Sequence, residues 1–455
     1  MKLSVLVLAA GKGTRMKSGI PKILHPILGM PMIHYVVNTV SSIKPDRLLM
    51  VIGSDGERIK NNLDKFAIEY VYQQAQLGTG HAVNSAKAAL LKFNGNILII
   101  NGDFPLITTK TLKSFVSKHS KGKSILSILT TELTNPTGYG RIIRGAKGDL
   151  IEVVEEKDCT QSQKQLKEIN SGLYLVQSGY LWKLLGEISS DNSQNEYYLP
   201  DIVRLSIKNG YKVSSYKSPD PDEVMGVNDR AQLCIAETIL KMRINKSLML
   251  GGVHIIDPES TYISPGVKIG RDTSVYPNSF LVGNTVIGKN TIIGPSCWIE
   301  DASIGNDVQI RMNCYVEKSV VSDNVIVGPF AHVRPDTLIS SNSKIGNFVE
   351  LKNSQIGLNS KVPHLSYIGD ATIGKNVNIG AGTITCNYDG LKKYKTVIED
   401  NVFIGSDTML VAPLRVGRNS TTGAGSTITK DVGENTLAIS RAKQTSISNW
   451  KRKPK

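Results

Sequence analysis

The first half of the chain alternates short apolar runs with longer amphipathic segments. A short continuous apolar run fits a buried strand, and a longer segment with apolar positions three or four apart fits a helix. Strands that alternate with helices form a mostly parallel sheet with helices on both faces, so we predict an α/β, Rossmann-like domain. Ligands of such sheets bind at the carboxyl ends of the strands. The predicted elements are strand Leu3–Ala9, helix 31–41, strand 48–52, helix 80–91 and strand 96–100.

From about residue 229 the pattern is helical, and it ends at Gly251-Gly252. The glycines that follow the last apolar position are typical of a helix end. We therefore predict a connecting helix over 229–251. Its apolar positions fall on one face, and they are Leu233, Ala236, Leu240, Ile244 and Leu248.

Beyond Gly252 an aliphatic residue followed by glycine recurs at spacings near multiples of six. This period is typical of a parallel β-helix, in which three such units make one triangular turn and each turn buries its face against the next. Similar coils are left-handed, against the usual right-handed crossover. The pairs are Ile269-Gly270, Ile287-Gly288, Ile293-Gly294, Ile304-Gly305, Val327-Gly328, Ile345-Gly346, Ile356-Gly357, Ile373-Gly374, Ile379-Gly380, Ile404-Gly405 and Val416-Gly417.

Length and charge narrow the possible classes. A chain of 455 residues usually forms more than one domain. The net charge is +15, but outside the tail the basic residues are scattered and aromatic residues make up only 6%, which favours phosphorylated substrates over nucleic acid. The five cysteines follow no disulfide or zinc pattern, so we expect a reducing, cytoplasmic setting. No apolar run is long enough to cross a bilayer.

The segment from Leu8 to Met16 follows the first predicted strand and contains Gly11-Lys12-Gly13-Thr14-Arg15. It is not a Walker loop, which closes in Gly-Lys-Ser/Thr, and Met16 stands where a dinucleotide fingerprint needs its third glycine. The glycines let backbone N–H groups approach phosphate oxygens, while Lys12 and Arg15 add positive charge. We interpret the segment as a phosphate-binding loop. A tight turn with exposed basic residues is the alternative that these residues alone leave open.

With Pro21-Lys22, this loop resembles the signature of sugar-phosphate nucleotidyltransferases. Further segments follow in order: Gln76-Leu77-Gly78-Thr79-Gly80-His81-Ala82, Gly102-Asp103, Pro136-Thr137-Gly138-Tyr139-Gly140-Arg141, Glu155, Asn170-Ser171-Gly172 and Gly226-Val227-Asn228. With them the whole chain resembles the bacterial bifunctional N-acetylglucosamine-1-phosphate uridyltransferase and glucosamine-1-phosphate acetyltransferase family. The resemblance implies a uridyltransferase domain over 1–228, a linker helix over 229–251 and a left-handed β-helix acetyltransferase domain with a C-terminal tail over 252–455.

In the first domain the resemblance implies that a sugar-1-phosphate oxygen attacks the α-phosphorus of UTP. This reaction needs positioning and charge stabilisation rather than a general base. Arg15 and Lys22 would neutralise the leaving pyrophosphate, and Asp103 and Asn228 would bind Mg²⁺, a hard ion that prefers oxygen ligands. The nucleotide sugar is expected at Leu8, Ala9, Ala10, Gly11, Lys22, Gln73, Gly78, Thr79, Asn101, Gly102, Asp103, Gly140, Glu155, Asn170 and Asn228.

In the second domain His364 interrupts the repeat, as an inserted loop or a catalytic residue would. An amine nucleophile needs a base whose pKa lies near the working pH, and histidine fits. The resemblance makes His364 the base that takes the amine proton of glucosamine-1-phosphate. Cys386 is interpreted as a thiol near the pantetheine, because direct transfer needs no covalent intermediate. The sugar phosphate is expected at Arg334, Lys352, Tyr367 and Asn378, and acetyl-CoA at Ala381, Asn387, Tyr388, Ser406, Ala424 and Arg441.

Three residues depart from the family pattern: Asn101 replaces a common Tyr, Pro363 a Gly and Ser366 a Thr. The family resemblance implies a homotrimer with small-molecule partners, namely glucosamine-1-phosphate, N-acetylglucosamine-1-phosphate, UTP and acetyl-CoA, and neither nucleic acid nor membrane. Its product, UDP-N-acetylglucosamine, supplies peptidoglycan and lipopolysaccharide precursors. Two alternatives stay open: a monofunctional sugar nucleotidyltransferase with a structural coil, and a non-catalytic scaffold or nucleic-acid-binding protein.

Overall fold

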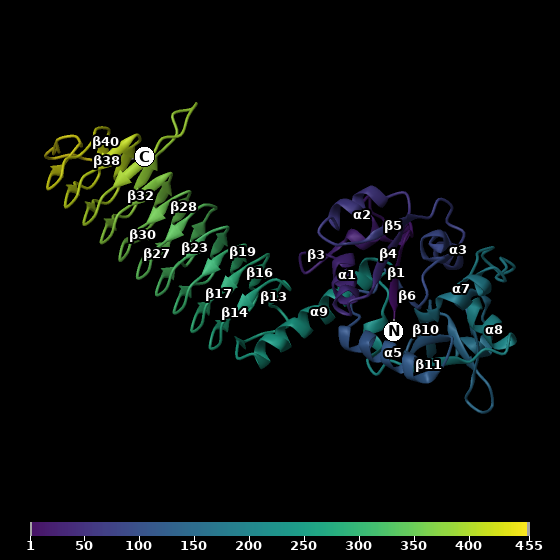
Figure 1. Ribbon diagram of the computed structural model, residues 1–455. Helices are drawn as coiled ribbons and strands as arrows, with labels where there is room; N and C mark the ends of the chain where they lie inside the picture. Colours follow the sequence, from purple (N-terminus) through teal and green to yellow (C-terminus); the bar gives the residue numbers. More distant parts are fainter. Residues whose placement is uncertain (1, 453–455) are drawn as a thin grey trace. The chain divides into compact units, whose positions relative to one another are not determined.

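The computed structural model describes residues 2–452 and divides the chain into two compact units, Met1–Leu240 and Lys241–Lys455. The division falls within helix α9, Arg230–Leu250, which differs by one residue at each end from the helix predicted over 229–251 (Figure 1). Each unit has a hydrophobic core of its own residues. None of the helices in the described part of the chain is long and apolar enough to cross a membrane.

The first unit is built on a twisted sheet. Its strands are β1 Leu3–Ala9, β4 Arg47–Ile52, β5 Glu69–Tyr72, β6 Asn96–Asn101, β7 Leu126–Glu132, β8 Arg141–Arg144, β9 Leu150–Val154, β10 Glu168–Gln177 and β11 Val213–Lys217. They lie in the order β11-β7-β10-β6-β1-β4-β5, with β8 and β9 attached beside β10. The strands β6, β1, β4 and β5 run parallel, and β10 is antiparallel to both of its neighbours. A separate hairpin joins β2 Pro26–Ile27 to β3 Met30–Pro31.

Alternate residues of β1 enter two different cores. Val5 and Val7 pack in one core with residues of α1 and α5, while Leu6 packs in the other with residues of α3, α7 and α8. This period of two places one helical layer on each face of the sheet, as predicted. The helices are α1 Met32–Ser42, α2 Gly56–Asn62, α3 Thr79–Ser85, α4 Lys87–Leu90, α5 Thr109–Gly122, α6 Gln161–Lys164, α7 Ser178–Leu185 and α8 Asp201–Lys208.

The helix predicted over 80–91 is two helices, α3 and α4, separated by Ala86. Ala86 has ψ near 0, and its N–H donates to the carbonyls of both Val83 and Asn84, which tightens the last turn of α3. Another boundary moves by one residue, because Pro31 precedes α1 rather than joining it.

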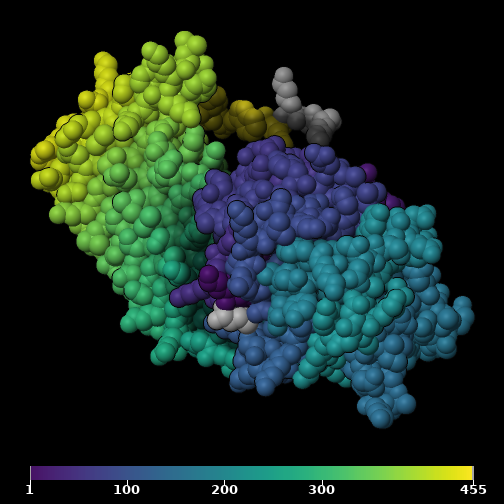
Figure 2. Space-filling view, turned by 45° about the vertical axis from the view of Figure 1, so that its right-hand side comes forward, coloured from purple at the N-terminus to yellow at the C-terminus, as the bar shows by residue number. Residues whose placement is uncertain are grey.

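The second unit is a parallel β-helix, as the repeat predicts (Figure 1). Three parallel sheets run along it: the first coil sheet from β12 His254–Ile255 to β41 Leu437–Ala438, the second from β13 Tyr262–Ile263 to β40 Thr427–Ile428, and the third from β14 Lys268–Ile269 to β38 Leu414–Val416. The aliphatic member of most repeats is buried in a continuous core. In the space-filling view the colour passes steadily from green to yellow along the coil, so successive turns are neighbours (Figure 2).

Asparagines at one corner show how long each turn is. The Asn359 amide donates to Asn376, 17 residues later, whereas Asn376 donates to Asn401, 25 residues later. The longer turn contains an excursion after β34, Ile384–Cys386, that returns at β35, Thr396–Ile398. All five cysteines are free, and the coil brings buried Cys297 next to buried Cys314 on consecutive turns.

Candidate active sites

Two adjoining cavities lie at the carboxyl ends of β1 and β6. Their volumes are about 360 Å³ and about 230 Å³. Leu8, Thr79, Asn101 and Asp103 line both, so the cavities form one continuous site. Parallel strands end at this edge of the sheet, which is where such folds bind ligands.

The structure gathers the predicted nucleotide-sugar residues around this site. The first cavity is lined by Leu8, Ala9, Ala10, Gly11, Lys22, Gln73, Gly78, Thr79, Asn101 and Asp103. The second adds Arg15, Gly140, Glu155, Asn170 and Asn228. Gly102 lines neither cavity; its N–H donates to Leu8 O at 2.8 Å and ties the end of β6 to β1.

Two glycines of the site cannot carry a side chain. Gly13 has φ +61, and a Cβ there would lie 2.5 Å from the Cβ of Lys22. Gly78 has φ +102, and a Cβ there would lie 2.6 Å from Tyr197 O. Both close approaches require glycine, because L side chains rarely adopt this backbone region. Gly13 thereby lets the predicted phosphate-binding loop pack against the residue that delivers the Lys22 ammonium.

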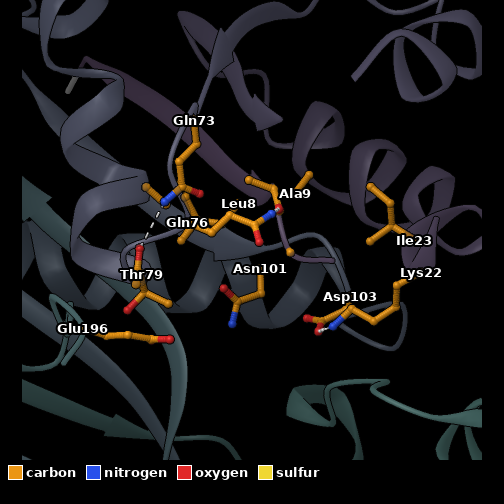
Figure 3. A pocket seen from close by; sticks show the side chains of 14 residues that line it. Leu8, Ala9, Lys22, Ile23, Gln73, Gln76, Thr79, Asn101, Asp103 and Glu196 are labelled. Carbon is orange, nitrogen blue, oxygen red and sulfur yellow. Dashed lines mark hydrogen bonds and ion pairs between the residues drawn. The ribbon is translucent and has the colours of Figure 1, made fainter. Parts of the chain in front are cut away.

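A charged cluster lies where the cavities meet. Figure 3 shows its Lys22 and Asp103 side chains pointing toward one another. The Lys22 ammonium forms a short ion pair with Asp103 Oδ2 and donates to Asn228 Oδ1 at 3.2 Å. Arg15 Nη2 also donates to Asn228 Oδ1, at 2.9 Å. The two predicted metal ligands are held together by the Val227 N–H, which donates to Asp103 O at 3.0 Å. The structure thus brings Arg15, Lys22, Asp103 and Asn228 into one group.

This group fits a hard divalent cation. Asp103 Oδ1 is buried and has no hydrogen-bond partner among the described residues. A buried carboxylate oxygen without a partner is costly unless a cation or donor meets it. Asn228 Oδ1 adds a second oxygen ligand beside it, and two such ligands with substrate phosphates suit Mg²⁺. In this structure the Lys22 ammonium balances the charge of Asp103.

The second cavity contains a polar network of the kind that holds hydroxyl groups. Asn170 donates from its backbone N–H to Gly140 O at 2.8 Å and from its side chain to Tyr174 OH at 2.6 Å. Burial, with the nearby carboxylates of Asp158, Asp201 and Glu196, raises the pKa of Glu155 to about 7. A carboxyl group with this pKa is partly protonated at neutral pH, so it can both donate and accept hydrogen bonds.

On the coil, His364 ends strand β30, Lys361–His364, at the corner between the first and second coil sheets. Its Nδ1 lies 2.5 Å from Oδ1 of Asn347, the residue paired with it on the preceding turn. An amide oxygen accepts a hydrogen bond, so Nδ1 carries the proton and Nε2 keeps the lone pair. The ring is exposed and oriented as a general base requires.

Three predicted acetyl-CoA residues stack above His364 at the same corner. The Gly382 N–H donates to His364 O, the Asp407 N–H to Ala381 O and the Gly425 N–H to Ser406 O. This ladder aligns His364, Ala381, Ser406 and Ala424 in one column along successive turns. Arg441 Nη1 donates to Ala424 O at 2.8 Å and marks the end of the column.

Basic side chains gather on the second coil sheet. Lys352 and Tyr367 lie on β28, Glu350–Lys352, and β31, Tyr367–Gly369. Arg334 Nη1 forms an ion pair of 2.8 Å with Glu350. The Lys352 ammonium lies beside Lys393 and lowers the pKa of that lysine. The three cationic side chains of Arg334, Lys352 and Lys393 lie near Tyr367, an arrangement suited to binding a phosphate group.

The remaining predicted residues of the coil, Asn378, Asn387 and Tyr388, lie outside the column that contains His364. Asn378 begins β33, Asn378–Ile379, and pairs with Lys361 on the preceding turn. The Asn387 side chain donates to Asp370 Oδ2 at 2.5 Å, so its amide supports the corner of the excursion. Tyr388 is exposed, with its hydroxyl donating to Gly390 O at 2.6 Å.

The chain is 47% identical over 454 residues to the bifunctional protein GlmU of Geotalea uraniireducens, covering 100% of this chain and 99% of that protein. It is 46% identical over 448 residues to the bifunctional protein GlmU of Streptococcus agalactiae serotype V, covering 98% and 97%.

The chain belongs to the GlmU family.

Domain families match both halves of this GlmU-family chain. Residues 5–164 match the MobA-like NTP transferase domain, residues 250–351 the EIF2B subunit epsilon LbH domain, and residues 395–430 the bacterial transferase hexapeptide (six repeats). A solved UDP-glucose pyrophosphorylase complexed with UDP-glucose aligns with a TM-score of 0.43 and 20% identity, covering 53% of this chain and 100% of that chain. The predicted fold, a nucleotidyltransferase domain followed by a left-handed β-helix of hexapeptide repeats, is confirmed.

Membership of the GlmU family also decides between the functional alternatives. The chain is a bifunctional uridyltransferase and acetyltransferase in the synthesis of UDP-N-acetylglucosamine. The hypotheses of a monofunctional sugar nucleotidyltransferase and of a non-catalytic scaffold or nucleic-acid-binding protein are therefore excluded.

No role was predicted for several residues of the sites. Gln76, which opens the motif that ends at Ala82, and Glu196 line the first cavity, and the Gln76 amide donates to Ala10 O in a short hydrogen bond. Asn347 lies 17 residues before His364, so the coil period could have found it. Lys393 lies in the excursion, and no repeat could have placed it beside Lys352.

Proposed function

We propose that the N-terminal unit, with a domain boundary near residue 228, transfers uridylyl and that the coil from residue 252 transfers acetyl, with 229–251 as the connection. The coil acts first, on glucosamine-1-phosphate, and the N-terminal site then uses the N-acetylated product with UTP. The cluster of Lys22, Asp103, Asn228 and Arg15 at the junction of two cavities is the observation that carries the uridylyl assignment. It places positive charge where a nucleotide and a sugar phosphate would meet.

In the uridylyl step a sugar-phosphate oxygen forms a bond to the α-phosphorus while the bond to pyrophosphate breaks. The first cavity binds the nucleotide, and the network of Glu155 and Asn170 holds the sugar hydroxyls. Lys22 and Arg15 face the phosphates and stabilise the charge that develops on the leaving group. Bound at Asp103 and Asn228, Mg²⁺ would supply further charge neutralisation at the phosphates.

In the acetyl step the amine nitrogen attacks the thioester carbonyl, a C–N bond forms and the C–S bond breaks. His364 Nε2 takes the proton of the attacking amine and returns it to the departing thiolate of CoA. Arg334, Lys352 and Lys393 hold the sugar phosphate beside Tyr367, and Asn378 completes the sugar site. The column of Ala381, Ser406 and Ala424 receives the pantetheine, with Arg441 at the phosphate end.

We further propose a cytoplasmic homotrimer in which neighbouring coils share each acetyltransferase site. Tyr388 supports this part, because its exposed side chain on the excursion is free to contact a neighbouring copy. The product would enter the synthesis of cell-wall and lipopolysaccharide precursors.

Two single substitutions test the assignment. Incubation with glucosamine-1-phosphate, acetyl-CoA, UTP and Mg²⁺ should release CoA and pyrophosphate. His364→Ala should lower CoA release by about 10²- to 10⁴-fold and spare pyrophosphate release from added N-acetylglucosamine-1-phosphate. Asp103→Ala should do the reverse. His254→Ala, an exposed change on the coil, and Asp64→Ala, an exposed change in the N-terminal unit, are the matched controls and should spare both activities. Loss of both activities from one folded variant would contradict separate sites, and sedimentation of an active monomer would contradict the trimer.

A further inference from the structure

One corner of the coil changes character at His364. At this corner one residue of each successive turn adopts positive φ. In chain order these residues are Asn278, Ser296, Asn313, Phe330, Phe348, Leu365, Gly382, Asp407 and Gly425. Most are Asn, Asp, Ser or Gly, which tolerate this region best. Phe330, Phe348 and Leu365 are the large apolar exceptions, and they occupy three consecutive turns. We call these three the apolar ridge.

The side chains of the apolar ridge stabilise the fold too little to offset the strain of their backbone conformation. Phe330, Phe348 and Leu365 are 43%, 55% and 61% exposed, with φ of +57, +55 and +50. The two phenyl rings stack with centroids 5.2 Å apart and planes within 13°. A bulky side chain in this region is strained, and an exposed apolar group gains little from folding. Strain kept in exposed side chains beside a catalytic residue points to a ligand contact.

The opposite side of His364 is bare of large side chains. The next three turns place Gly382, the exposed Asp407 and Gly425 at the corresponding position, and a Cβ on Gly425 would meet nothing within 4 Å. Arg441 lies at the far end of this bare stretch. With a strand spacing of about 4.8 Å, the three steps from Ala424 to His364 span roughly 14 Å. A thin, extended chain with its phosphates at Arg441 would fit this channel and would end at His364.

We propose that Leu365 and Phe348 close this channel beyond His364 and restrict the acyl donor to acetyl-CoA. The inference rests on the proposed acetyl transfer. When the pantetheine follows the bare corner, the thioester carbon reaches the amine at His364, and the acyl tail continues toward the preceding turn. Leu365, directly after His364, and Phe348, on the preceding turn, present their side chains there. An acetyl methyl ends before them, and each added methylene must displace an apolar side chain.

The test compares acetyl-, propionyl- and butyryl-CoA with glucosamine-1-phosphate, using CoA release from the full-length protein. The wild type should favour acetyl over butyryl, since one methylene in a fitted pocket changes kcat/KM by about 10- to 200-fold. Leu365→Gly and Phe348→Gly should raise kcat/KM for butyryl-CoA at least about 10-fold relative to acetyl-CoA. Glycine adopts positive φ freely, so both variants keep the corner. Leu365→Asn repeats the test with a residue that the same corner already uses at Asn313.

Phe330→Gly is the matched control, because it removes the same side chain one turn farther from His364. It should leave acyl selectivity unchanged, and pyrophosphate release should be unchanged in every variant. Unaltered selectivity in Leu365→Gly and Phe348→Gly would overturn the proposal. The proposal would also be overturned if a ridge variant kept its acyl selectivity but dissociated in sedimentation. The apolar ridge would then be a contact between copies of the chain. Absence of CoA release from the wild type with any donor would instead overturn the proposed acetyl transfer.

Discussion

Asn347 Oδ1 and His364 Nδ1 lie 2.5 Å apart on consecutive turns of the coil, so the residue that fixes the imidazole stands one turn before it. Removing the amide frees the ring to rotate and to change tautomer. We expect Asn347→Ala to lower kcat for acetyl transfer by about 10-fold or more, within the range that a general base supplies.

Asn347→Asp distinguishes a role of Asn347 in orienting the His364 ring from a purely structural role. A carboxylate beside Nδ1 favours the imidazolium over the neutral ring. The acid limb of the pH profile of kcat/KM for CoA release should therefore move to higher pH. Asn342→Asp, an exposed change elsewhere on the coil, should leave the profile in place, and an unshifted profile in Asn347→Asp would contradict the role.

The Lys22–Asp103 ion pair predicts competition between the ammonium and Mg²⁺. Lys22→Met removes the ammonium, so Mg²⁺ should bind about 10-fold tighter in calorimetry, since losing one close cation is worth about 1.4 kcal/mol or more. Pyrophosphate release should nevertheless slow by about 10²-fold, because the leaving group loses charge stabilisation. Lys17→Met, an exposed change on the same loop, should alter neither quantity. Unchanged Mg²⁺ affinity in Lys22→Met would contradict the competition.

Glu155 makes the N-terminal unit less stable as the pH rises. Burial raises the pKa of its carboxyl from 4.5 to about 7, so the folded state holds a proton that the unfolded state has lost between these values. The unfolding free energy should therefore fall between pH 4.5 and pH 8, by about 3 kcal/mol at most.

The isosteric Glu155→Gln variant should lack this part of the pH dependence. Urea unfolding can be followed by Trp182, which is buried in the N-terminal unit, once Trp298 and Trp450 are changed to Phe in both proteins. The difference between the two proteins should be largest at high pH. Parallel pH profiles would show that Glu155 ionises normally.

Gly346 has no room for a side chain, since a Cβ would lie 1.6 Å from the backbone oxygen of Pro363. Gly346→Ala should displace the strand that ends in His364, cost about 3 kcal/mol or more in coil stability, and lower CoA release. Gly433→Ala is the matched change on the coil, where a Cβ would meet only Thr436 Oγ1 at 3.4 Å. Pyrophosphate release should survive both changes, and normal CoA release from Gly346→Ala would refute the steric argument.

Periodicity predicted the architecture because it depends on residues close in sequence. Strand β1 alternates between two cores, and the coil repeats aliphatic residues at fixed intervals, so both patterns are local. The break at Ala86 could not be foreseen, because the apolar pattern continues through it. Ala86 is fully buried, so packing rather than helix propensity decides its conformation.

The sites were only partly predictable for the same reason. Motifs of the sequence pointed to Asp103 with Lys22 and Asn228, and to His364, but neighbours outside the motifs depend on tertiary contacts. The pKa of Glu155 depends on Glu196 and Asp201, which are distant in sequence. Lys393 reaches Lys352 only through the path of the excursion, which follows no repeat.

The 25-residue turn of the coil has a consequence for how such a protein can evolve. Each turn touches only its neighbours, so stacking tolerates extra residues at a corner as long as the strands on either side keep their register. The excursion adds Lys393 and Tyr388 without disturbing β33 or β36, Phe403–Ile404, which still pair directly. New chemistry can therefore be acquired by lengthening one corner, while the residues that keep the protein folded evolve under separate constraints.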